Sequence, residues 1–250
     1  MYFLYNELLH RPLLNLLVII YNTVAFKSIG LAVIFLTILV RLILFPVFHK
    51  ITKNQLLIQK IQPEIKTATD RFKHDKEKQV KEVMAIYKKH NLNPLSGFLL
   101  LFIQLPVLIA LFYLFYNGFT PDSLVGLYSF VLKPDIINSQ FLNLINLNEP
   151  SIIIVALTAL CQYFTSRLSL PKINQNQPET SAGKLNRQMT LIAPILTFVI
   201  LWSLPAVIGL YWLTTTIFSL GQQSFINRSL STYGSIKDNF KNPDYSHESK

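Results

Sequence analysis

The sequence predicts an all-α membrane protein whose chain crosses the bilayer five times. Hydrophobic residues make up 51% of the 250 residues and charged residues only 14%, whereas a soluble domain carries about 25% charged residues. Four regions are apolar and long enough, or nearly so, to span a hydrocarbon core of about 20 helical residues. The last region, residues 189–226, has no charge and contains Pro205, which can divide it into two helices.

The five expected spans follow from these apolar regions. An undivided helix over residues 189–226 would be about 57 Å long, nearly twice the thickness of the hydrocarbon core. Division at Pro205 gives two spans of ordinary length. The predicted spans are residues 29–48, 98–116, 151–166, 189–203 and 206–226.

The basic residues predict how the chain lies in the membrane. The formal net charge is +10, and eleven of the 23 Lys and Arg residues lie between residues 49 and 97. With five spans, this loop shares one side of the membrane with residues 167–188 and the tail 227–250, and the other side holds only three basic residues. The positive-inside rule makes the basic side cytoplasmic, with the N-terminus outside. In a membrane protein this charge reports topology, and we expect no specific nucleic-acid binding.

The sequence divides into an external segment, a membrane core and a tail. The external segment, 1–28, contains the apolar stretch 12–26, and Arg11, just before it, falls on one helical stripe with Asn15 and Asn22. This pattern predicts an interfacial helix on the outer face, with a buried packing helix as the alternative. The core is 29–226, including loop 49–97, and the cytoplasmic tail is 227–250.

Loop 49–97 has the pattern of a helical hairpin. Its second half repeats Val80, Val83, Met84 and Tyr87 at helical spacing, and 70–78 forms a polar tip. Pro63 is placed to kink or to begin a helical arm. Two interpretations stay open: a basic surface against anionic headgroups, and a mobile arm that meets arriving protein segments or the ribosome.

The spans lack the residues of an enzyme. No Asp or Glu lies in any span, the five histidines are scattered, and no Gly-rich phosphate loop occurs. The single cysteine, Cys161, excludes a disulfide within the chain and a Cys-based metal site. The sequence therefore predicts neither an enzyme nor a metal or cofactor site.

One charge in a span requires an explanation. Arg41 is the only charged residue of 29–48, and a charge at this depth costs at least about 2.5–3.5 kcal/mol on insertion scales. No span offers a carboxylate partner. The guanidinium can snorkel toward the cytoplasmic interface, or it can lie in a hydrated cavity at membrane depth lined by polar residues. The other polar residues of the spans are Thr37, Gln104, Gln162, Tyr211, Trp212 and Thr214 to Thr216.

Three stretches resemble the YidC-type membrane protein insertases, the bacterial branch of the Oxa superfamily. They are "LTILVRLILFP", continuing into "QLLIQKIQPEIKTATDRF"; "YKKHNLNPLSGFLLLFIQLPVLIALFY"; and "LPAVIGLYWLTTTIFSLGQQSFINR". They occur in the order and spacing of the family and cover most of the chain, from about Leu13 to Arg228.

The resemblance implies a specific architecture and site. Five helices would enclose a hydrophilic groove that is open to the cytoplasm and to lipid but closed on the outer side. It also implies a cytoplasmic hairpin and an external amphipathic helix. With Thr215 added from the polar run of the last span, the groove residues are expected to be Thr37, Arg41, Gln104, Gln162, Tyr211, Trp212 and Thr215.

The chain departs from the family pattern in two motifs and in its tail. The common "NPLGGC" reads "NPLSGF" here, and the usual "TSN" of the last span reads "TTT". The tail carries four basic and three acidic residues, so it lacks the strong charge of a dedicated ribosome-binding tail.

The implied function is that of an insertase or chaperone in the cell membrane. It would receive nascent membrane proteins and release their apolar segments into the lipid bilayer, alone or with the Sec translocon, and the ribosome is a further candidate partner. The alternative is a small-solute transporter or channel, which predicts an internal repeat or intramembrane carboxylates. The sequence contains neither.

Overall fold

The computed structural model of the chain describes residues 6–116, 124, 126–168 and 181–241. Helices dominate this part of the chain, and the strands are two short segments of a hairpin. The elements in chain order are η1 (Asn6–His10), α2 (Arg11–Thr23), α3 (Ile29–Ile43), α4 (Phe45–Lys60), α5 (Gln62–Arg71), α6 (Lys76–Lys89), α7 (Ser96–Tyr116), β1 (Gln140–Phe141), β2 (Ile145–Asn146), α8 (Ile152–Leu168), α9 (Ser181–Leu201) and α10 (Ala206–Lys241).

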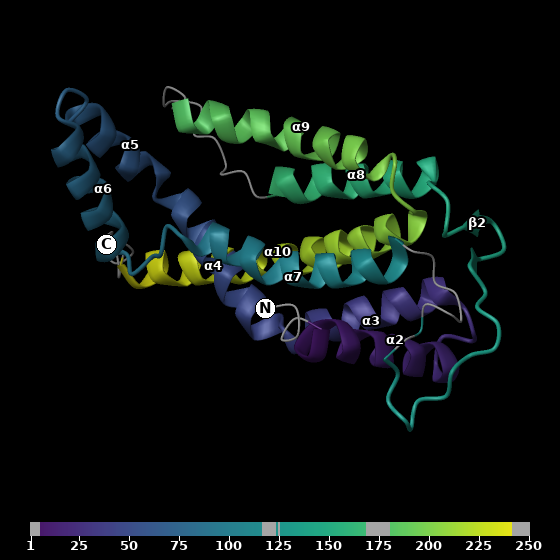
Figure 1. Ribbon diagram of the computed structural model, residues 1–250. Helices are drawn as coiled ribbons and strands as arrows, with labels where there is room; N and C mark the ends of the chain where they lie inside the picture. The colour runs from purple at the N-terminus through teal and green to yellow at the C-terminus, as the bar shows by residue number, and fades with distance from the viewer. Residues whose placement is uncertain (1–5, 117–123, 125, 169–180, 242–250) are drawn as a thin grey trace, which may run out of the picture.

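The long helices are arranged around α10. Helix α8 packs against both α10 and α9, and α3 packs against α10 and α2 (Figure 1). The hairpin of α5 and α6 projects from one end of this bundle, and the β1–β2 hairpin lies at the opposite end (Figure 1). The apolar core runs through α2, α3, α7, α8 and α10.

The first predicted span is not one straight helix. The apolar run 29–48 is divided at Leu44 into α3 and α4, whose axes differ by 71°. Pro46 lies in the first turn of α4, where its missing N–H and fixed φ suit a new helix start and cannot continue the hydrogen bonds of α3. The apolar run 29–48 is therefore two helices joined by a bend, and a membrane span over these residues stays a prediction.

The remaining helices follow the predicted spans with different lengths. Helices α7 and α8 begin and end within two residues of the predicted limits. The chain breaks before Ala206, as Pro205 predicted, but α9 begins already at Ser181 and α10 continues to Lys241. Residues 227–241 are thus helical and extend the last helix, while 242–250 lie outside the described residues.

Among the described helices, none taken singly combines the length and the hydropathy that a bilayer crossing requires. The bent pair α3 and α4 meets these criteria when its two helices are counted together.

The predicted hairpin within 49–97 is formed by α5 and α6. Pro63 lies in the first turn of α5, and the Asp75 carboxylate caps α6 by accepting a hydrogen bond from the Lys78 backbone N–H at 3.1 Å. Glu64 of α5 pairs with Lys89 at 2.8 Å and with His90 at 2.7 Å, which joins the base of the two arms. These two hydrogen bonds hold the pKa of the Glu64 carboxyl below its ordinary value.

Helix α2 is a packing element of the core. Its buried face includes Leu14, Leu17 and Val18, each with no exposed surface, and this face packs against α3. The structure therefore corresponds to the alternative interpretation of a buried packing helix, and an additional position at the membrane interface stays a prediction. The polar stripe that suggested an interfacial helix contacts another part of the protein.

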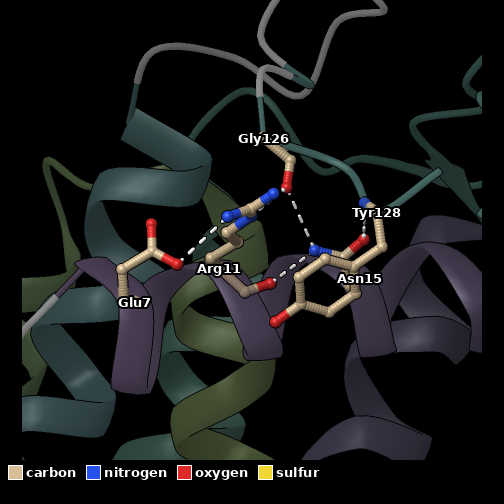
Figure 2. A network of polar contacts seen from close by, with 5 residues as sticks. All are labelled: Glu7, Arg11, Asn15, Gly126 and Tyr128. Atoms are coloured by element: carbon tan, nitrogen blue, oxygen red, sulfur yellow. Dashed lines mark hydrogen bonds and ion pairs between the residues drawn. The ribbon is translucent and has the colours of Figure 1, made fainter.

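That polar stripe binds the loop before β1 (Figure 2). Asn15, only 2% exposed, donates to the carbonyl of Gly126 at 3.2 Å and accepts from the backbone N–H of Tyr128 at 2.7 Å. The Arg11 guanidinium donates to the same carbonyl at 2.9 Å, pairs with Glu7 at 3.0 Å and lies 4.9 Å from the Tyr128 ring centroid. We refer to Glu7, Arg11, Asn15, Gly126 and Tyr128 as the Arg11 network.

The β1–β2 hairpin is seated on the N-terminal turn of α3. The ring of Phe141 packs directly over Gly30, and a Cβ atom at that position would overlap the ring. A backbone hydrogen bond from Ile29 to the carbonyl of Asn138, 3.3 Å long, supports the same contact. The loop 126–149 is therefore attached to α2 by polar contacts and to α3 by packing.

Candidate functional site

A small pocket, partly open to its surroundings, lies where α3, α4, α7 and α10 meet, next to α2. Apolar side chains form most of its wall, and polar side chains are few. Such a combination of an apolar wall and a few convergent polar groups is the usual form of a binding site. The lining residues are Leu13, Leu36, Thr37, Val40, Arg41, Leu44, Phe48, Ile103, Gln104, Val107, Leu111, Tyr211 and Thr215.

Arg41 is the only charged residue in this lining. The residue is 7% exposed, and its guanidinium donates one hydrogen bond, to Oε1 of Gln104 at 3.2 Å. The guanidinium carbon also lies 4.4 Å from the centroid of the Phe48 ring, in cation–π distance. A guanidinium has five N–H donors, so Arg41 has N–H donors for which no described residue provides an acceptor.

The break between α3 and α4 helps to hold this charge. Arg41 lies in the last turn of α3, and the C-terminal carbonyls of a helix carry a partial negative charge that favours a cation. A continuous helix over 29–48 would have placed Arg41 in its interior, away from any such terminus. The local reason for this arrangement is Pro46, which starts α4 and ends α3 within one turn of Arg41.

Gln104 connects three helices through its side-chain amide. Its Oε1 accepts from Arg41 of α3, and its Nε2 donates to the Tyr211 hydroxyl of α10. Gln104 lies two residues before Pro106, inside α7. Because both ends of the amide are engaged, the amide orients Arg41 and the Tyr211 hydroxyl relative to each other.

One of the two threonines, Thr37, contributes less polarity than the sequence suggests. The hydroxyl of Thr37, a residue 2% exposed, donates to the carbonyl of Val33 at 2.6 Å, within its own helix. Thr37 therefore lines the pocket mainly with its methyl group. Thr215 lies one turn after Tyr211 on α10 and also lines the pocket.

The structure brings together five of the seven predicted groove residues: Thr37, Arg41, Gln104, Tyr211 and Thr215. Gln162, on α8, and Trp212 are outside the pocket lining. Trp212 packs against the apolar core, because its position next to Tyr211 directs it to a different face of α10. A role of Gln162 and Trp212 in a larger groove stays a prediction.

Sequence reasoning missed one notable pocket residue, Phe48. It was treated as the interfacial end of a span, but it lies 2% exposed with its ring against the Arg41 guanidinium. Its seven-residue separation from Arg41 would place it about 10 Å away along one straight helix. Only the bend at Leu44 brings the two side chains together.

The chemistry of the pocket is that of binding polar or acidic groups. No carboxylate, histidine or cysteine occurs in its lining, so the lining holds no general base, and the uncompensated cation attracts hydrogen-bond acceptors and anions. Within the described residues, no group of three or more His, Cys, Asp or Glu side chains is placed to hold a metal ion.

Comparison with known proteins identifies the relatives of this chain. The family model of the 60Kd inner membrane protein matches residues 19–233. The membrane protein insertase YidC of Clostridium tetani is 30% identical over 211 residues, which cover 84% of this chain and 87% of that protein. The YidC of Clostridium perfringens is 35% identical over 78% of this chain and 77% of its own length.

Other relatives are longer. This chain spans 53% of the YidC of Streptomyces avermitilis, with which it shares 27% identity. A crystal structure of an active YidC insertase with its first transmembrane domain resolved matches 87% of this chain and 45% of that chain, with a TM-score of 0.57 and 24% identity, and so supports the fold. The sequence and the fold agree: the chain belongs to the 60Kd inner membrane protein family, that of the YidC membrane protein insertases.

Proposed function

We propose that the chain inserts proteins into the bacterial cell membrane by receiving a polar segment of the client at Arg41. The observation that carries this proposal is a buried guanidinium with a single hydrogen bond among the described residues, to a neutral amide, and no carboxylate in the lining of its pocket. A charge that served only the fold would be paired, because an unpaired buried charge is costly. An arriving carboxylate or backbone carbonyl would supply the missing partners.

The free energy of the reaction comes from the client. Moving an unpaired polar group out of water costs roughly 2–7 kcal/mol, and hydrogen bonds to Arg41 and Gln104 lower this cost. The apolar segment of the client then enters lipid, where each Å² of apolar surface removed from water contributes about 25 cal/mol. The protein lowers the barrier for the polar part, and no nucleotide is required.

We further propose that the pocket is part of a groove open to the cytoplasm and enclosed by five spans. Family membership places the chain in the bacterial cell membrane, and the basic residues of 49–97 favour a cytoplasmic position for the α5–α6 hairpin. In this topology the Arg11 network and the β1–β2 hairpin lie on the outer side. The Sec translocon and the ribosome are proposed as partners for clients that the chain does not insert alone.

Insertion into proteoliposomes tests the proposal. The client is a single-span protein with a short acidic N-terminal tail, and its insertion is measured as protection of the tail from added protease. We expect protection in liposomes that contain this protein and background protection in empty liposomes. A client whose tail acids are replaced by amides should be inserted less efficiently, because the attraction of the guanidinium for a full charge is lost.

The alternative of a small-solute transporter gives the opposite result. Liposomes containing the protein would then show no gain in client protection over empty liposomes, while flux of a small solute would rise. That outcome would overturn the proposal.

A further inference from the structure

A seam between α4 and α10 continues from the pocket toward the hairpin end of the molecule. The two helices contact each other, and the rings of Phe45 and Phe218 meet edge-on with centroids 6.5 Å apart. Both helices run away from the β1–β2 end (Figure 1). One helical turn beyond the ring pair, α4 carries His49 and α10 carries Gln222, so these residues lie on the same seam.

The seam contains hydrogen-bonding groups that the described residues do not satisfy. Nδ1 of His49 and Nε2 of Gln222 are both buried and have no hydrogen-bond partner within the described part of the chain. Gln222 is 7% exposed. Buried polar groups are nearly always paired, and an unpaired one in a native structure indicates a missing partner or a functional role. Two such groups on one seam point to a partner that binds there.

The seam and the pocket share one face of α10. On α10, Tyr211, Thr215, Phe218 and Gln222 follow one another at steps of four, three and four residues, which places them on a single face. The stretch from Tyr211 to Gln222 corresponds to about 16 Å of helix. On α4, Phe48 covers the Arg41 guanidinium, and the next residue, His49, borders the seam.

The connection between α3 and α4 allows the seam to widen. α4 leaves α3 at an angle of 71°, and Leu44 between the two helices has φ −86° and ψ 1°, outside the helical region. Such a junction can absorb a change in angle without breaking the interior of either helix. A small rotation of α4 would separate Phe45 from Phe218 and uncover Arg41.

We propose that this seam is the entrance to the pocket, and that His49 and Gln222 are the first hydrogen-bond contacts of an extended polar segment of the client. This inference rests on the proposed function. An extended chain presents unpaired N–H and C=O groups at every residue, and these groups require partners when they leave water. The Gln222 amide offers a donor and the His49 ring a donor or an acceptor. About five extended residues would bridge from Gln222 to Arg41.

Site-specific cross-linking tests the entrance. The native cysteine is removed by Cys161→Ala, and single cysteines are introduced by Gln222→Cys and by the control Gly221→Cys. Gly221 is the neighbouring residue, is exposed, and has no atom within 4 Å of the position of a Cβ, so it accommodates the new side chain. A ribosome-stalled client with one cysteine in its polar tail should form a disulfide with position 222 and not with position 221. Equal yields at both positions would overturn the inference.

A second variant separates binding from folding. Gln222→Leu removes the unpaired amide and keeps a similar volume, so the thermal stability of the protein should stay equal or rise. Loss of one hydrogen bond to the client should lower insertion of polar-tailed clients about fivefold. A purely structural Gln222 would give the opposite pattern, with lower stability and insertion reduced only in proportion to folded protein.

The two proposals fail in distinguishable ways. If the wild-type protein gives no insertion over empty liposomes, the proposed function fails. If the wild-type protein inserts the client but position 222 forms no cross-link above position 221, only the entrance is wrong.

Discussion

Two of the arginines in the helices, Arg11 and Arg41, have sharply different surroundings. Arg11, with a side chain 34% exposed, has a carboxylate at 3.0 Å, a carbonyl at 2.9 Å and a tyrosine ring at 4.9 Å. Arg41, with 7% of its surface exposed, has one amide oxygen at 3.2 Å and a phenylalanine ring. The more deeply buried charge therefore has the fewer hydrogen-bond partners.

This difference separates a structural charge from a charge available for binding. Desolvation is most costly for the most buried charge, and folding alone would favour giving Arg41 the larger number of partners. Arg11 follows this rule, since its contacts fix one loop to one helix. Arg41 departs from it, in a pocket that is partly open to its surroundings. We therefore assign fold stability to the Arg11 network and client binding to the Arg41 pocket.

The largest expected effect on the structural side comes from Asn15. Asn15→Ala removes hydrogen bonds to Gly126 and Tyr128 in a fully buried position and should destabilise the protein by about 3 kcal/mol. Thermal unfolding in detergent measures the change. Asn22→Ala is the matched control, because Asn22 on the same helix makes one exposed hydrogen bond, to Leu132 at 2.8 Å. Equal losses for both variants would contradict the role given to the Arg11 network.

A substitution where the β1–β2 hairpin packs on α3 should lower the stability of the protein nearly as much. Gly30→Ala forces a methyl group into the Phe141 ring, and overpacking of this kind costs about 1–3 kcal/mol. Gly221→Ala, where the new methyl group meets nothing, should be neutral or stabilising by up to about 1 kcal/mol through helix propensity. The same unfolding assay compares the two, and a stabilising Gly30→Ala would show that the hairpin is not seated on α3.

Within the pocket, Gln104 should affect insertion more than stability. Gln104→Leu leaves Arg41 without its amide partner and frees the Tyr211 hydroxyl, so a client segment should bind with poorer geometry and insertion should fall about fivefold. Gln162→Leu is the control, because Gln162 was also predicted to lie in the groove but is outside the pocket lining. Proteoliposome insertion rates distinguish them. If Gln162→Leu has the greater effect, the functional groove extends beyond the described pocket.

The smallest expected effect is the pH dependence of the stability of the α5–α6 hairpin. The pKa of Glu64 is lowered by hydrogen bonds from Lys89 and His90, so the carboxylate form favours the folded hairpin. Its contribution is fully present above the ordinary carboxyl value of 4.5 and is lost as the pH falls through the lower folded value. Protection of α5 and α6 from hydrogen exchange should therefore decrease as the pH is lowered below about 4.5, after correction for the intrinsic rate.

The same experiment has a control in the exposed pair Glu77–Lys81 of α6. Glu77→Gln should leave exchange at the base of the hairpin unchanged, while Glu64→Gln should increase it at neutral pH. Equal behaviour of the two variants would show that Glu64 does not hold the arms together.

The sequence predicted the helices with continuous apolar runs most accurately. Helices α7 and α8 were located within two residues because hydropathy alone delimits them. The chain break at Pro205 was also correct. The bend within 29–48 was not predictable from hydropathy, since the run is apolar on both sides of Leu44 and only the backbone requirements of Pro46 divide it.

Contacts between distant residues account for the other differences. The partners of the α2 stripe lie more than 100 residues away in the sequence, so its polar residues were assigned to solvent and an interface. In the pocket, the resemblance to the YidC-type insertases predicted the groove residues, but the bend at Leu44 determines which residues lie beside Arg41. Phe48 joins Arg41 through that bend, whereas Trp212 lies on a different face of α10 from Tyr211, outside the pocket lining.

The central claim is tested most directly by replacing each arginine separately. Arg41→Ala and Arg11→Ala are compared with the wild-type protein for insertion of the acidic-tailed client and for thermal stability, and Arg41→Lys shows whether charge alone is sufficient. We expect Arg41→Ala to lower insertion about 10- to 100-fold, the equivalent of charge-assisted hydrogen bonds worth about 1.5–3 kcal/mol, without loss of stability. Arg11→Ala should lower stability and leave insertion per folded molecule unchanged. Wild-type insertion by Arg41→Ala, with a loss of insertion in Arg11→Ala, would contradict the account.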